Sequence, residues 1–187
     1  MSYTRRRFVR HAGVGALSFF VAGCRQELTP AEARDQGIAF QILSAEEVGT
    51  LEVMGDALVP GSAAAGIAHF IDHQLAAPAA EQLLMIKYLG VPAPYVDFYR
   101  GGLRGARLTA QAIYGKPAAE LSSDEATDFV GKIAGGSVED WEGPPAGFFY
   151  FVLRADAVDV VYGTPQGFAD LGVPYMAHIE PPSRWGE

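Results

Sequence analysis

The stretch from Phe148 to Tyr162 reads FFYFVLRADAVDVVY, and it decides how this chain can fold. It is apolar on almost every face and rich in residues that favour strands, so its periodicity does not separate one buried helix from two short strands. Fifteen residues without a turn signal favour a single helix. A helix that is apolar all round must be covered all round. The rest of the domain or a partner subunit can supply that cover.

Further helices are predicted on the N-terminal side of this stretch. The longest runs from Pro94 to Tyr114, where apolar residues recur every three or four positions. Gly101 and Gly105 in it would permit a neighbouring backbone to approach closely. Other helices are predicted from capping boxes or apolar stripes at Thr29–Glu32, Ser44–Glu47, Ile67–Leu75 and Ser122–Glu125. The sequence therefore predicts an all-α fold, a single compact domain of five to six helices with an irregular C-terminal arm over residues 163–187.

The composition bounds both size and function. A chain of 187 residues, 49% of them hydrophobic, suffices for one globular domain and hardly two. A formal net charge of −8 argues against nucleic acid as the main partner, because phosphate contacts need a basic surface. The single cysteine excludes an intrachain disulfide, a four-cysteine zinc site and a c-type haem.

The first 23 residues resemble a twin-arginine export signal. Arg5 and Arg6 are followed by an apolar run of about 12 residues, too short to span a bilayer that needs ~20. The run ends in Val-Ala-Gly-Cys24, which looks like a bacterial lipobox whose cysteine takes the lipid. The alternative is a buried N-terminal helix with a core cysteine. We expect a signal peptide over residues 1–23, a tether over 24–43, and the helical domain over 44–187.

The predicted export signal bears on where the mature chain lies and on what it carries. The predicted mature chain is periplasmic and bound through lipid to the inner or the outer membrane, and its net charge is −12, with 10 basic and 22 acidic residues. The twin-arginine route carries proteins already folded. The mature sequence has no G-x-G-x-x-G, P-loop, H-E-x-x-H or G-x-S-x-G motif. The cargo is therefore expected to be another subunit.

Three groups of polar side chains are candidate sites within the helices. His69 and His73 stand four apart, a spacing that could hold a metal, on a stripe expected to face water or a partner; a polar helix face is the favoured alternative. A basic stripe lies beside the apolar positions of the helix predicted from Pro94 to Tyr114, and it consists of Arg100, Arg104 and Arg107. It could bind carboxylates of a partner, or it could be a solvated face with local ion pairs. Asp156 and Asp159 could do acid–base work, but an exposed edge or a salt bridge is favoured.

The C-terminal arm is the fourth candidate. Glycines and prolines punctuate a segment dense in aromatic residues, which suits either a wrap around the chain's own core or an arm laid on another subunit. Its interface candidates are Phe168, Tyr175, Met176, His178 and Trp185.

These motifs together resemble a known family. The export signal, the segment DALVPG from Asp56, the segment GIAHFID from Gly66, the apolar stretch from Phe148, and YGTPQGFADLGVPYMAHIEPPSRW from Tyr162 look like the gluconate 2-dehydrogenase subunit 3 family. The resemblance covers most of residues 45–187. Not all members of that family carry a lipobox, so Cys24 is an addition.

The resemblance implies a small, non-catalytic subunit with no catalytic residues and no cofactor of its own. It implies a large partner of the glucose-methanol-choline type that holds FAD and oxidises a sugar, a sugar acid or a related alcohol. A cytochrome c subunit with haem c commonly takes the electrons, and the small subunit often carries the large one out. Two rivals stay open: a free-standing periplasmic ligand-binding lipoprotein, and a metal-dependent enzyme that uses His69, His73 and His178.

Overall fold

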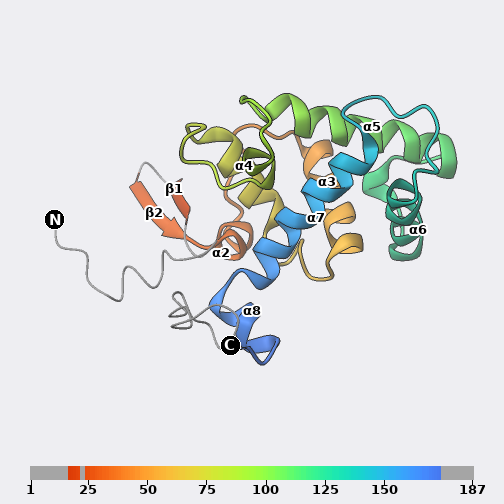
Figure 1. The fold of residues 1–187 in the computed structure, drawn as a ribbon. Coiled ribbons are helices and arrows are strands. Elements are labelled where there is room, and N and C mark those ends of the chain that lie inside the picture. Colours follow the sequence, from red (N-terminus) through yellow and green to blue (C-terminus); the bar gives the residue numbers. More distant parts are fainter. Residues whose placement is uncertain (1–16, 22–23, 174–187) are drawn as a thin grey trace, which may run out of the picture.

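Helix α7 (Ala146–Tyr162) runs through the middle of the molecule. The structure is a computed structural model that describes residues 17–21 and 24–173 (Figure 1). The prediction of one helix over 148–162 is confirmed. The helices that contact α7 include α3 (Ala45–Leu58), α4 (Ile67–Ala76), α5 (Val96–Tyr114) and α6 (Ser123–Ala134). These neighbours supply most of the cover that its apolar sequence requires.

The remaining elements are short. They are β1 (Leu17–Val21), β2 (Cys24–Leu28), α2 (Pro30–Asp35), the 3-10 helices η1 (Met85–Leu89) and η2 (Ala118–Glu120), and α8 (Pro165–Asp170). The all-α class is confirmed. The described residues contain seven α-helices, one more than the upper prediction. Part of the arm that was expected to be irregular is α8, because the Thr164 hydroxyl caps it by accepting from the Gly167 N–H at 3.0 Å.

Two predicted capping boxes begin helices where the sequence placed them. At α3, the Ser44 N–H donates to the Glu47 carboxylate at 2.7 Å, and the Glu47 N–H donates back to the Ser44 hydroxyl. Ser122 and Glu125 repeat the arrangement at α6. Each box satisfies two backbone donors that a helix leaves unpaired at its start.

The close approach predicted at the glycines of α5 is present. A Cβ on Gly105 would lie 2.6 Å from the Glu142 carbonyl oxygen and 2.8 Å from the Trp141 ring, so the loop before α7 packs directly on the backbone of α5. At Gly102, helix α7 packs directly on the backbone of α5, since a Cβ there would lie 2.2 Å from the ring of Phe149. The closest α5–α7 contact thus depends on a position with no side chain.

The N-terminal part of the described chain packs against α2 and α4. Strands β1 and β2 form an antiparallel hairpin that the sequence did not predict, and it buries Leu17, Phe19 and Leu28. The short helix predicted from Thr29 is α2, and its capping box is confirmed. Gly66 has a φ of 85°, and a Cβ there would lie 2.3 Å from the backbone of Pro30. Most of the segment expected as a tether is therefore packed on the helical domain, while the predicted chain division at residue 23 stays a prediction.

Among the helices of the described residues, none combines the length and the apolar composition needed to cross a bilayer.

Candidate functional site

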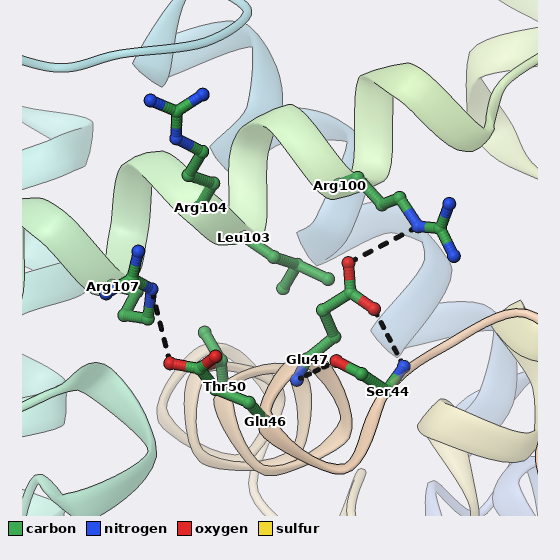
Figure 2. Close-up of a pocket in the computed structure, with 8 residues that line it drawn as sticks. All are labelled: Ser44, Glu46, Glu47, Thr50, Arg100, Leu103, Arg104 and Arg107. Carbon is green, nitrogen blue, oxygen red and sulfur yellow. Dashed lines mark hydrogen bonds and ion pairs between the residues drawn. The ribbon is translucent and has the colours of Figure 1, made fainter.

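The basic stripe of α5 faces the start of α3 across a shallow pocket (Figure 2). Arg100 pairs with Glu47, at 3.4 Å between Nε and Oε1, and also donates to the Ile42 carbonyl at 2.6 Å. Arg107 pairs with Glu46 at 3.2 Å. The pocket has a volume of about 190 Å³, and it is lined by Ser44, Glu46, Glu47, Thr50, Arg100, Leu103, Arg104 and Arg107. The stripe and the first turn of α3 therefore form one charged surface.

Arg104 behaves differently from the other two arginines. In Figure 2 its side chain points away from α3, and its Nη2 donates to the Glu142 carboxylate at 2.7 Å in the loop before α7. Both side chains of this pair are more than 60% exposed, so the pair adds at most about 1 kcal/mol. All three arginines have a partner in their own chain, as the solvated-face alternative expects. Their role toward another subunit stays a prediction.

The polar stripe of α4 is covered by the chain itself, which corrects the expectation that it faces water or a partner. Asp72 is buried and accepts the backbone N–H groups of Gln41, Ile42 and Leu43 at 2.8–2.9 Å. These three bonds hold the segment before α3 against α4. The sequence could not place this segment, because no periodicity marks residues 38–43.

The two histidines of α4 also contact parts of the chain that precede α3. His69 is buried, its Nε2 lies 3.0 Å from the Ile38 carbonyl, and its ring lies against Phe40. The His73 ring lies 4.9 Å from that of Phe19 in β1. Within residues 17–21 and 24–173 no group of three or more histidine, cysteine, aspartate or glutamate side chains could hold a metal ion. His178, which the metal alternative requires, lies outside the described residues.

A buried carboxylate joins three elements at the centre of the fold. Asp156 of α7 is completely buried and accepts the Tyr99 hydroxyl of α5 at 2.5 Å and the Met85 N–H of η1 at 2.9 Å. The expectation of an exposed edge or a salt bridge is therefore wrong for Asp156. Burial raises the pKa of Asp156 to about 7, although both hydrogen bonds act in the opposite direction. Burial and the neighbouring carboxylate together raise the pKa of Tyr99.

The sequence contained a signal for this site. A helix that is apolar on almost every face must be largely covered, so a carboxylate on its covered side has to find hydrogen-bond donors within the fold. Tyr99 lies among the apolar positions of α5, and its hydroxyl donates a hydrogen bond to the Asp156 carboxylate. The hydrogen bond between Asp156 and Tyr99 was not predicted from the sequence, because aspartates are seldom buried without a cation.

The outer face of α7 is open to solvent. Phe151 is 49% exposed and Val158 is 37% exposed, and Arg154 lies between them. With Met85, Ala155 and Asp159 they line a shallow groove with a volume of about 180 Å³. Burial raises the pKa of Asp159. This groove is the part of α7 for which the described chain supplies no cover.

The remaining predicted residues lie at the two ends of the chain. Phe168 is half-buried in α8, and Cys24 is the first residue of β2. The other predicted residues lie outside the described part, namely Arg5, Arg6, Tyr175, Met176, His178 and Trp185.

One comparison with known proteins gives a match. The sequence profile described as gluconate 2-dehydrogenase subunit 3 matches residues 45–178, which begin with α3 and include α7 and α8. No curated protein and no solved structure matches the chain.

Proposed function

The chain belongs to the gluconate 2-dehydrogenase subunit 3 family, and on that premise we propose that it is a non-catalytic subunit that escorts, stabilises and anchors a large dehydrogenase subunit. The observation that carries this proposal is the family match over residues 45–178. The family is named for a subunit of a dehydrogenase complex. The match covers almost the whole helical domain, so the accessory role applies to the folded part of the chain.

The proposed partner is an FAD-dependent subunit of the glucose-methanol-choline type. It would oxidise an alcohol carbon of a sugar, a sugar acid or a related alcohol to a carbonyl, and a cytochrome c subunit would accept the electrons through haem c. No residue of the present chain is assigned to hold either group. Its own contribution is to bind the large subunit and to carry it to the membrane.

The N-terminal sequence supports the escort and the anchor. Arg5 and Arg6 lead into a short apolar run that ends at Cys24, the only cysteine in the chain. A signal for folded cargo on a chain of this family fits a large subunit that is loaded with its cofactor in the cytoplasm and then exported with its escort. The lipid on Cys24 would hold the complex on the periplasmic side of a membrane.

The escort is tested by following the large subunit rather than this chain. The full chain is co-expressed with a candidate large flavoprotein subunit, and dehydrogenase activity with an artificial acceptor is measured in the cytoplasm and the periplasm. We expect periplasmic activity with the unchanged chain and cytoplasmic activity with the double variant Arg5→Lys, Arg6→Lys. Periplasmic activity that survives the double variant would contradict the escort.

The anchor and the accessory role need separate measurements. Cys24→Ala should release the active complex from the membrane fraction into the soluble periplasmic fraction. The purified chain alone should show no turnover of sugars or alcohols with an artificial acceptor. Turnover by the purified chain without another subunit would refute the accessory role.

A further inference from the structure

The outer face of α7 has the properties of a docking surface. The side chains that point into the fold are buried, namely Phe149, Val152, Leu153, Asp156, Ala157 and Val160. Phe151 and Val158 face outward two turns apart, and large apolar side chains on an otherwise covered central helix mark a face that lacks a neighbour. In Figure 1, α7 crosses the centre of the molecule and leads directly into α8.

The groove has the size of one side chain. Its volume is about 180 Å³, and a protein cavity of roughly 150 Å³ accommodates a benzene molecule. Phe151, Val158 and Met85 provide apolar walls. The groove therefore fits a single aromatic or branched aliphatic anchor, which is the kind of residue that dominates binding energy at protein interfaces.

Two opposite charges flank the groove. Within the described part of the chain, the side chains of Arg154 and Asp159 form no hydrogen bond and no ion pair, whereas the arginines of α5 are all paired. Asp159 is half-buried, and a carboxylate that has lost part of its water without a compensating cation is destabilised. The two residues are five positions apart, a rise of about 7.5 Å along the helix. A surface that complements the groove would place a cation near Asp159 and an anion near Arg154.

The helix that carries the groove leads into the start of the C-terminal arm. Helix α8 contacts α7, and beyond it Leu171 and Val173 are 56% and 48% exposed. The arm over residues 163–187 is the predicted interface of the sequence. The groove and the beginning of the arm thus lie on two helices that contact each other, α7 and α8.

We propose that the groove on the outer face of α7 is where this chain docks the large dehydrogenase subunit, which inserts one aromatic or aliphatic side chain between Phe151 and Val158. A lysine or arginine of the large subunit pairs with Asp159, and a carboxylate pairs with Arg154. This inference rests on the proposed function, and it adds the surface and the chemistry of the contact.

The test is co-purification from cells that express the tagged full chain together with the large flavoprotein subunit. We expect Phe151→Asp to lower the amount of large subunit recovered by about tenfold or more, because it places a charge where an apolar anchor binds. Asp159→Lys should lower recovery as well, since it opposes the cation of the partner. The matched control is Ile113→Asp on α5, where an apolar side chain is similarly exposed at 42%, and recovery should not change.

A thermal melt of each chain alone accompanies the co-purification. Phe151→Asp should lower the melting temperature no more than the control Ile113→Asp does, because the two side chains are similarly exposed in the isolated chain. If Phe151→Asp lowers it much more than the control does, and a deletion of residues 174–187 lowers it as well, the chain's own C-terminal segment fills the groove and the inference is wrong.

The remaining outcomes separate this inference from the proposed function. If the unchanged chain recovers the large subunit and both α7 variants do so equally well, the complex exists but docks elsewhere, and the groove is refuted. If the unchanged chain recovers no large subunit, the accessory function itself fails and the groove fails with it.

Discussion

The substitution Asp156→Asn should remove a pH dependence that the buried carboxylate imposes on the stability of the fold. The pKa of Asp156 is raised to about 7 by burial, against an ordinary value of 3.8 that applies to the unfolded chain. The folded chain therefore holds this proton more tightly than the unfolded chain does. The contribution of Asp156 to the free energy of unfolding is largest below about pH 4 and falls as the pH rises to about 7.

The size of the effect follows from the two pKa values. A difference of about 3 pKa units, at roughly 1.4 kcal/mol per unit, gives about 4 kcal/mol between pH 4 and pH 8. Asparagine has nearly the same shape, keeps one oxygen that can accept from Tyr99 or from the Met85 N–H, and carries no charge. The variant should therefore gain stability relative to the unchanged chain as the pH rises through this range.

The assay is urea denaturation followed by circular dichroism at pH 5, 6, 7 and 8. All other titrating groups are common to the two proteins, so the difference between their unfolding free energies isolates Asp156. Tyr99→Phe removes one of the two donors to the carboxylate and should extend the fall in stability to higher pH. Curves for the unchanged chain and Asp156→Asn that run parallel from pH 5 to pH 8 would refute the reasoning, whatever their constant offset.

Four further substitutions test the packing that positions the candidate surfaces. Asp72→Ala should lower the free energy of unfolding by about 3 kcal/mol in urea denaturation, because three backbone donors lose their acceptor. A loss below about 1 kcal/mol would contradict the conclusion that Asp72 holds residues 41–43 against α4. Gly105→Ala should destabilise the chain by about 2 kcal/mol in the same assay because its methyl group would overlap the Glu142 carbonyl oxygen, whereas Gly131→Ala in the open middle of α6 should stabilise it by up to about 1 kcal/mol. Equal effects at the two glycines would argue against the close approach. Arg107→Ala should change the melting temperature of the isolated chain by less than about 3 °C, because the pair with Glu46 is exposed to solvent; a larger fall would show that the stripe stabilises the fold.

Local rules predicted most of the helices. Capping boxes at Ser44 and Ser122 mark helix starts in a few residues, and the length of the apolar run from Phe148 to Tyr162 distinguishes a buried helix from strands without any tertiary information. The glycine spacing in α5 correctly predicted a close backbone approach, but it did not show that the loop before α7 makes the approach.

The polar contacts were harder to predict, because they join residues far apart in the sequence. Asp72 binds backbone N–H groups some 30 residues earlier, and any residue type can supply a backbone N–H, so no side-chain pattern marks the partner. Asp156 meets Tyr99 across 57 positions. The stripe on α4 was expected to face water or a partner because it lies opposite the apolar face of that helix. Only the tertiary structure shows that a second layer of the same chain lies over it.

The packing of α2 on Gly66 limits how far the folded domain can stand from a bilayer. With the proposed lipid on Cys24, only the residues up to Thr29 separate the lipid-bearing position from the first turn of α2, where Pro30 and Ala33 are buried. The six residue steps from Cys24 to Pro30 span at most about 22 Å even when fully extended, which is shorter than the roughly 26 Å length of a 17-residue helix such as α7. The chain would then act as a short spacer, and a large subunit bound to it would be confined to a thin layer next to the membrane surface.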